Sequence, residues 1–187
     1  MLLALAALAL VALAGCGNAH TRVTTGTYAG ETGAGAPYLN VGPLTYEVQL
    51  SRALSPFDIE DASYLQGLSA IQRPLSPEQE WFAVFLQVYN TTSSSEPAAS
   101  EVTITDSQGK VYAPVLPASS NQFAYRAGTV PAKGRLPVPD SIAAAGPTQG
   151  ALLLYKIQLV SLNNRPLKLR IVDPGDAAQT ASAELDV

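Results

Sequence analysis

Few residues in this chain of 187 are suited to catalysis or metal binding, because it contains one cysteine, Cys16, and one histidine, His20. A Cys/His metal cluster and an internal disulfide each need more of these residues than a single chain provides. Catalysis by a core histidine or thiolate is not expected either, since both residues lie near the N-terminus. The sequence therefore predicts a protein that is not an enzyme and needs no cofactor.

Three carboxylates stand close together at Asp58, Glu60 and Asp61, in a segment, 52–77, that shows no regular hydrophobic period. Carboxylate oxygens are suitable ligands for Ca²⁺, which takes about six to eight of them. The spacing here matches no known calcium loop, and a solvated acidic turn is the commoner arrangement. These three residues are the candidate binding residues of the chain, with no metal assigned to them.

A continuous apolar run, residues 2–14, comes just before Cys16. It is too short to span a hydrocarbon core of roughly 30 Å but suits a signal peptide. With Leu13, Ala14 and Gly15 in front of Cys16, the run resembles the bacterial lipobox, whose cysteine is diacylated after the signal peptide is removed. The resemblance implies a signal peptide over 1–15, lipid attachment at Cys16, and a place on the extracytoplasmic face of the cell membrane.

One feature departs from the usual secretory signal, because no Lys or Arg precedes the apolar run. A signal peptide without a lipid, or a buried N-terminal helix, therefore stays open as an alternative. Residues 16–43, which include His20, are rich in Gly, Ala and Thr, and this composition is typical of a flexible tether. Within it, 38–41 is either a short first strand or the point where the tether docks. The folded domain is expected over 44–187.

The most distinctive stretch of that domain is 81–90, which combines aromatic and β-branched residues without Gly or Pro. This composition predicts an interior strand with both faces covered. Trp81, Phe85 and Tyr89 share the face opposite the main core. They could form an aromatic platform for sugars or peptides, but the sequence favours a cover supplied by 52–77, since large exposed apolar patches are rare.

The remaining segments predict an antiparallel, immunoglobulin-like β-sandwich of about seven strands. A hairpin is expected at 101–106 and 110–115, with Gly109 at the turn position that needs a positive φ. The segment 52–77 is expected to hold a short helical turn, with apolar spacing at Tyr64, Leu65, Leu68 and Ile71, and residues 176–187 a weak edge strand or a frayed tail. The other predicted strands are 44–51, 122–126, 151–160 and 166–172.

The order of these features resembles a known family. A long apolar strand that ends in Asn90 (84–90) is followed by the hairpin turn at 106–112. This pattern resembles the telokin-like extracellular domains of bacterial lipoproteins, which are related in fold to a mycobacterial secreted immunoprotective antigen. The resemblance covers about residues 44–172. It implies an immunoglobulin-like fold and brings no catalytic residue to this chain.

The formal net charge of −4 argues against a nucleic-acid partner, because the clustered Lys and Arg that bind phosphates are missing. We expect a membrane-anchored extracytoplasmic lipoprotein that acts as a non-enzymatic binding module. Its expected partners are membrane lipid, through acylated Cys16, and an envelope protein or cell-wall component. The alternative is an ion- or small-molecule-binding accessory lipoprotein of a transporter or sensor.

Overall fold

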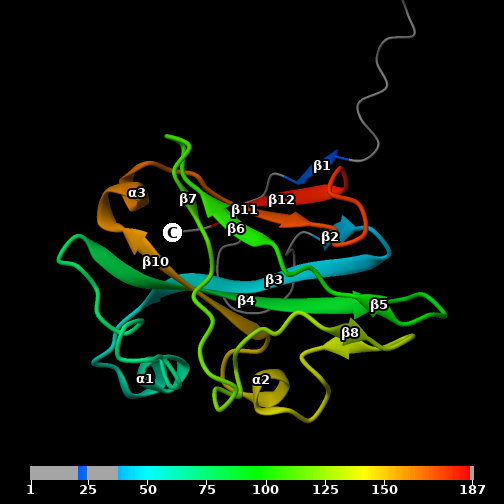
Figure 1. Cartoon of the computed structure of the whole chain (residues 1–187), viewed down its shortest axis with the longest axis horizontal. Helices are drawn as coiled ribbons and strands as arrows, with labels where there is room; N and C mark the ends of the chain where they lie inside the picture. The colour runs from blue at the N-terminus through cyan, green and yellow to red at the C-terminus, as the bar shows by residue number, and fades with distance from the viewer. Residues whose placement is uncertain (1–20, 25–37, 186–187) are drawn as a thin grey trace, which may run out of the picture.

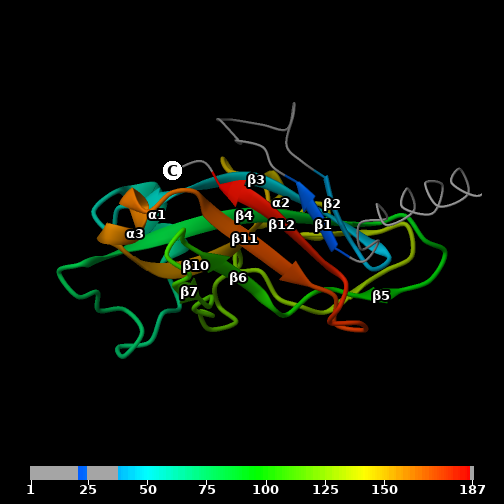
Figure 2. The ribbon, with the colours of Figure 1, turned by 90° about the horizontal axis from the view of Figure 1, so that it is seen from above.

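The computed structural model describes residues 21–24 and 38–185, and it confirms an all-β sandwich with antiparallel sheets and a few short helices (Figures 1 and 2). The helices are α1 (Ile59–Tyr64), α2 (Ile142–Ala145) and α3 (Leu159–Asn163). The strands are β1 (Thr21–Thr24), β2 (Tyr38–Val41), β3 (Leu44–Leu54), β4 (Gln79–Asn90), β5 (Glu96–Pro97), β6 (Val102–Thr105), β7 (Val111–Tyr112), β8 (Thr129–Val130), β9 (Arg135–Leu136), β10 (Ala151–Gln158), β11 (Leu167–Val172) and β12 (Thr180–Leu185).

Two main sheets face each other across the core. One sheet has the order β1-β12-β11-β6-β7, and the other has the order β10-β4-β3-β2, with β9 also pairing with β4. Strands β5 and β8 form a separate two-stranded ribbon. Several of these strands are only two residues long, which is why the structure has more strands than the roughly seven expected.

Strand β4 is buried on both faces, as its composition predicts. Phe82, Val84 and Leu86 point into the main core between the two sheets. Trp81 and Phe85 point the other way, into a second cluster that the segment after β3 covers. The sheet β10-β4-β3-β2, which we call the central sheet, is therefore a middle layer with apolar packing on either side.

The predicted hairpin is confirmed as β6 and β7, which pair antiparallel with Ile104 opposite Tyr112. Gly109 has a φ of +83°, the left-handed region that favours glycine. The Asp106 carboxylate accepts the backbone N–H groups of Gln108 and Lys110, each at 2.9 Å. A turn formed by a glycine and a nearby aspartate can be predicted from sequence, because the residues that stabilise it are neighbours in the chain.

The strand predicted at 122–126 is wrong. This segment forms an isolated parallel bridge, with Ala124 opposite Leu152, rather than a strand. The cause is Asn121, whose Oδ1 accepts the N–H groups of Phe123 at 2.9 Å and Ala124 at 3.0 Å. A side chain that takes up the backbone donors in this way competes with a strand ladder.

The strand predicted at 151–160 is confirmed over its first eight residues only, because β10 ends at Gln158. Its neighbour β4 begins at Gln79, which lies opposite Gln158, so no partner strand is present beyond that point. The chain turns instead into α3, and Leu159 is exposed rather than part of the core face. Leu153, Tyr155 and Ile157, earlier in the same strand, lie in the main core.

Two ends of the predicted domain also differ from expectation. Within the range predicted as a flexible tether, β1 pairs in parallel with β12. β2 pairs antiparallel with β3, which is the short first strand that the sequence left open for 38–41. Those residues therefore belong to the sandwich. The C-terminal segment forms β12, which pairs with both β1 and β11, so it is neither an edge strand nor a frayed tail over Thr180–Leu185.

Candidate binding surfaces

The predicted acidic residues build the start of α1. Asp58 is the N-cap residue, and its Oδ1 accepts the N–H groups of Glu60 at 2.9 Å and Asp61 at 3.2 Å. This arrangement satisfies backbone donors that a helix leaves unpaired at its first turn. Glu60 is exposed, and its Oε1 accepts a hydrogen bond from the Tyr64 hydroxyl at 3.2 Å.

Asp61 is buried and points back toward β3. It accepts the Arg52 guanidinium at 2.5 Å and the backbone N–H of Ser55 at 2.8 Å. Burial alone would raise the pKa of the Asp61 carboxyl, but these two donors hold it below its ordinary value. The carboxylate therefore ties α1 to the end of β3.

The three predicted residues thus have three different partners and form no shared site. Over residues 21–24 and 38–185, no group of three or more His, Cys, Asp and Glu side chains is placed to hold a metal ion. Asp58 and Glu60 remain at the surface, where a partner can reach them. Cys16, the predicted lipid attachment site, lies outside the described residues.

The segment 55–77, which we call the insertion, covers the second face of the central sheet with its inner side. Tyr64 lies edge-on against Phe85, with ring centroids 5.1 Å apart, and against Phe123 at 4.9 Å. Leu65 and Leu68 complete the cover over Trp81. The favoured interpretation of the aromatic face is therefore confirmed: Trp81 and Phe85 are buried and form no exposed platform.

The third aromatic of that face, Tyr89, is partly buried. Its hydroxyl donates to Glu47 Oε2 at 3.0 Å and also contacts Gln87. Burial, followed by these contacts with Glu47, raises the pKa of Tyr89 to about 12. This tyrosine links the polar side chains of neighbouring strands β3 and β4.

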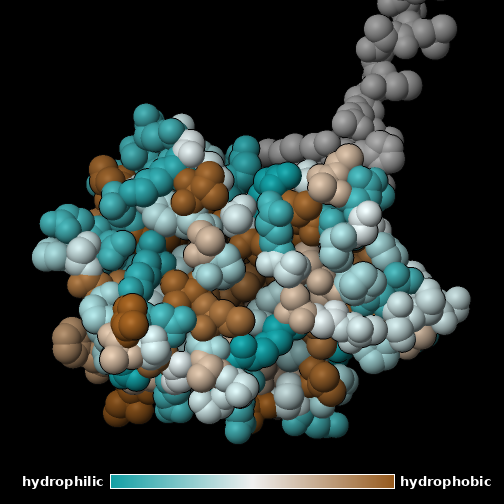
Figure 3. All heavy atoms as spheres, viewed as in Figure 1, coloured by the Kyte–Doolittle hydropathy of each residue, from teal (hydrophilic) through white to brown (hydrophobic). Residues whose placement is uncertain are grey.

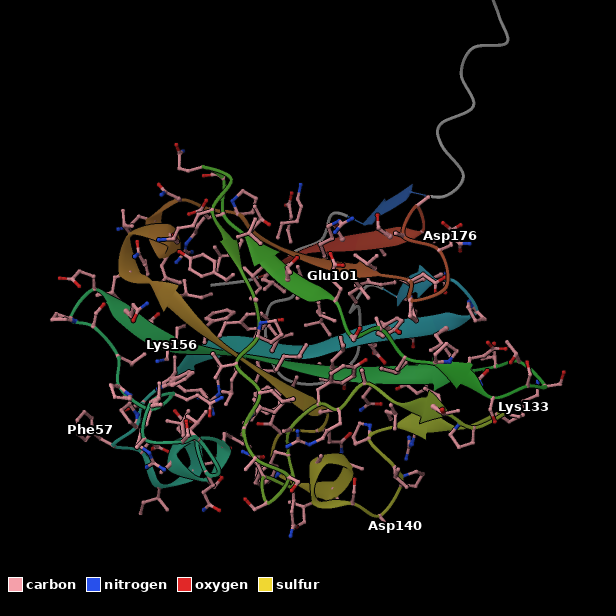
Figure 4. All side chains as sticks on the ribbon, viewed as in Figure 1. Phe57, Glu101, Lys133, Asp140, Lys156 and Asp176 are labelled. Atoms are coloured by element: carbon pink, nitrogen blue, oxygen red, sulfur yellow. The ribbon has the colours of Figure 1, made fainter. Side chains whose placement is uncertain are left out.

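The outer side of the insertion is apolar and uncovered. Phe57 is 96% exposed, and Ile59 and Ile71 are each 91% exposed. Figure 4 shows Phe57 pointing away from the domain beside α1. We call these three residues the insertion surface. Sequence analysis missed it, because the spacing of Ile71 suggested packing and nothing local distinguishes a buried isoleucine from an exposed one.

The insertion is held firmly while its tip residues stay exposed. Ala118 donates its N–H to the Gly67 carbonyl at 2.8 Å, and Gln72 Nε2 donates to the Leu116 carbonyl at 3.1 Å. Lys156 Nζ donates to the Pro74 carbonyl at 2.6 Å. The insertion surface therefore stands on a segment bonded to the domain at several points.

A hollow of about 390 Å³ lies beside β10, where the connection 113–127 crosses it. Figure 3 shows apolar residues gathered at the centre of this face. The connection covers the strand edge: Val115 donates to the Leu154 carbonyl and Tyr125 to the Leu152 carbonyl, both at 2.7 Å. Arg126, at the rim, donates to two backbone carbonyls. The hollow therefore offers shape but few polar groups to orient a ligand.

A second cavity, of about 290 Å³, lies where β3, β4 and α3 meet, and both charged and apolar side chains line it. Glu80 lines it, and Glu80 Oε1 is buried without a hydrogen-bond partner. Burial raises the pKa of this carboxyl. Sequence analysis missed Glu80, although a visible signal existed: the residue has the same parity as Phe82 and Val84, which face the core.

None of the helices in the described ranges has the length and apolar character needed to cross a membrane. No protein-family profile matches the chain. No curated protein matches it either.

Several solved structures have a similar fold. The yjhA protein from Bacillus subtilis is 11% identical, with a TM-score of 0.50, and the match covers 80% of this chain and 97% of that one. A functionally unknown protein from Listeria monocytogenes EGD-e is 10% identical, with a TM-score of 0.50, over 81% of this chain and 82% of that one. At such identities the similarity concerns the fold alone.

A candidate lipoprotein from Bacillus subtilis, ycdA, is 11% identical with a TM-score of 0.49. The match covers 81% of this chain but 39% of that one, so the chain spans about two fifths of the length of ycdA.

Proposed function

We propose that the chain is a membrane-anchored, extracytoplasmic lipoprotein whose domain is a non-enzymatic module that binds a partner protein through the insertion surface. The observation that carries this proposal is the exposure of Phe57, Ile59 and Ile71, each above 90%, on one firmly held segment. Single exposed apolar residues are ordinary, but a concentration of them on one protruding segment is a feature of interaction sites.

The placement of the insertion favours a protein over the membrane as its partner. Strand β1 begins five positions after Cys16, and in both ribbon views α1 lies on the other side of the domain from β1 (Figures 1 and 2). A lipid attached at Cys16 would hold the β1 side nearer the bilayer. The insertion surface would then face away from the membrane, toward other envelope components.

The charge around the insertion surface indicates the chemistry of the partner. Exposed Asp58 and Glu60 alternate along the chain with Phe57 and Ile59. A complementary surface would have an apolar pocket for the phenylalanine, flanked by Lys or Arg side chains. Asp58 and Glu60, the two exposed members of the acidic cluster, thus take the role of a charged rim.

Site-specific photocrosslinking in intact cells that make the full chain tests the proposal. A benzophenone amino acid placed at position 57 is expected to form an adduct with one protein, because Phe57 would sit at the centre of the interface. The same amino acid at position 138 is the matched control, since Val138 is also apolar and exposed but lies outside the insertion.

The adduct formed from position 57 should disappear when Ile59 and Ile71 are changed to serine. It should persist when Ile142, another exposed apolar residue, is changed to serine. Adducts with phospholipid instead of protein, or equal labelling from positions 57 and 138, would refute a protein partner at this surface.

The lipid anchor is tested separately. Cys16→Ser is expected to abolish incorporation of radiolabelled palmitate and to release the protein from the membrane fraction, because no second thiol is present. Incorporation that survives Cys16→Ser would exclude the proposed anchor while leaving the insertion surface untouched.

A further inference from the structure

The cavity at the end of the sandwich that Glu80 lines is built by three segments far apart in the sequence. β3 contributes Ser51, Arg52 and Ala53, β4 contributes Glu80 and Phe82, and the α3–β11 region contributes Leu162 and Arg165. No residue of the insertion surface takes part. A function of this cavity would therefore be additional to partner binding.

Glu80 is half-buried as a residue, and one of its carboxylate oxygens is an exception among the buried polar atoms. In the part of the chain that the structure describes, Glu80 Oε1 is the one buried side-chain nitrogen or oxygen without a hydrogen-bond partner. Buried carboxylates are normally paired, because removing a charge from water carries a large free-energy penalty. The pKa of Glu80 is raised by burial, and no neighbouring cation opposes that rise. An unpaired acid in a cavity is a group available to a ligand.

Arg165 supplies the opposite charge at the same cavity. Its Nε donates to the Leu162 carbonyl at 2.9 Å, whereas its two terminal nitrogens have no hydrogen-bond partner among the described residues. Arg52, the other guanidinium at this cavity, is already occupied by Asp61 and by the Ala53 carbonyl. The ion pairs in the described ranges are Arg52–Asp61 and Arg170–Glu101, so Glu80 and Arg165 do not pair with each other.

The cavity therefore carries one acid whose buried oxygen has no hydrogen-bond partner and one exposed guanidinium whose terminal nitrogens are unpaired. We propose that it binds a small zwitterion of the amino-acid type, with the ligand ammonium on the Glu80 carboxylate and the ligand carboxylate on the Arg165 guanidinium. The guanidinium fork suits a carboxylate, and a carboxylate that lacks a donor suits an ammonium. A volume of about 290 Å³ accommodates a single amino acid or a dipeptide rather than a longer peptide.

The two simpler ligand classes fit less well. A plain anion on Arg165 would bring a negative charge toward Glu80 and leave that carboxyl unpaired. A plain cation on Glu80 would leave the Arg165 charge uncompensated and crowd it with a like charge. A ligand that carries both charges contacts both groups. A ligand that carries one charge contacts one group and leaves the other without a partner, which is unfavourable.

The test is isothermal titration calorimetry on the full chain in detergent micelles. The probes are the free amino acids and the dipeptide Ala-Ala, with acetate and methylamine as half-ligands that carry one charge each. We expect saturable binding of at least one zwitterion and no saturable binding of either half-ligand. Glu80→Gln and Arg165→Gln should each weaken that binding by about tenfold or more, since each removes a charge-assisted contact.

Matched variants separate ligand binding from folding. Arg170→Gln removes an exposed arginine on β11 outside the cavity and should leave affinity unchanged. Arg165→Lys keeps the charge and should retain part of the affinity. The proposal would be overturned if no zwitterion binds, or if the Glu80→Gln variant binds the zwitterion as tightly as the wild type. Binding of acetate without binding of any zwitterion would overturn it as well. A stability coupling between Glu80 and Arg165 without ligand binding would overturn it too, because the two would then pair with each other.

Discussion

The two ends of β4 bury polar side chains in opposite ways. At the C-terminal end, Asn90 is 2% exposed, and its Nδ2 lies within hydrogen-bonding distance of the carbonyls of Ser94, Val130 and Pro131. Its Oδ1 accepts the N–H and the hydroxyl of Thr92, at 2.9 and 2.7 Å. At the N-terminal end, Glu80 Oε1 has no partner. A fully bonded polar group specifies the fold, while an unsatisfied one marks a place where the fold leaves bonding capacity unused.

The largest effect is expected from breaking the Asn90 network. Asn90→Ala removes the donors and acceptors that join β4 to the loops around Thr92 and Val130. Several buried backbone groups would lose their partners, so we expect a loss of about 3 kcal/mol in the free energy of unfolding. Urea denaturation followed by tryptophan fluorescence measures it.

Asn40→Ala is the control for this change, because Asn40 accepts its hydrogen bond from Thr45 Oγ1 at an exposed position. It should destabilise the domain by less than about 0.5 kcal/mol. Equal losses for Asn90→Ala and Asn40→Ala would show that the Asn90 network does not hold the loops as described.

Asp61 provides a paired carboxylate with which to compare Glu80. Asp61→Asn weakens the contacts with Arg52 and Ser55 that tie α1 to β3, and we expect a loss of about 1–2 kcal/mol at neutral pH. The folded-state pKa of Asp61 is lowered, so its contribution is present above the ordinary value of 3.8 and is lost as pH falls through the lowered pKa. Denaturation curves of wild type and variant should therefore differ at neutral pH and converge at strongly acidic pH.

The elements that sequence analysis predicted correctly have local signals. The strand predicted at 44–51 and the glycine at 109 depend on residues within a few positions of each other. The error at 122–126 has a distant cause, because Asn121 Nδ2 donates to the carbonyls of Tyr64 and Gln66, both at 2.8 Å. No pattern within the segment reveals a partner more than fifty positions away.

The candidate sites show the same limit. Asp58, Glu60 and Asp61 were visible as an acidic cluster, but neighbours in sequence need not converge on one ligand, and the structure gives them separate partners. The cavity at Glu80 requires Arg165 to arrive from the turn between α3 and β11, about eighty-five positions later in the chain. The sequence does contain one signal of this cavity: Glu80 is a charged residue at a core-facing position of the most apolar strand.

A smaller effect is expected at the cover of Trp81. Lys156 Nζ lies 5.2 Å from the centroid of the Trp81 ring and donates to the Pro74 carbonyl at the end of the insertion. Lys156 itself is labelled in Figure 4. Lys156→Gln should cost about 0.5–1 kcal/mol, because the cation–π contact is partly shielded from water. Lys110→Gln is the comparison, since Lys110 lies 5.5 Å from the Tyr112 ring without joining the insertion. Urea denaturation measures both.

The smallest change in stability is expected for Glu80→Gln, and it is the one substitution of the four that should stabilise the domain. The pKa of Glu80 is raised above 4.5, so its contribution to stability is present below that value and is lost as pH rises through the raised pKa. The other charged groups that line its cavity are the guanidinium groups of Arg52 and Arg165. The variant should therefore raise Tm by about 1–2 °C at neutral pH, and the gain should shrink toward pH 4. A decrease in Tm at neutral pH would mean that Glu80 is paired in the folded protein as Asn90 is, and the contrast between the two ends of β4 would fail.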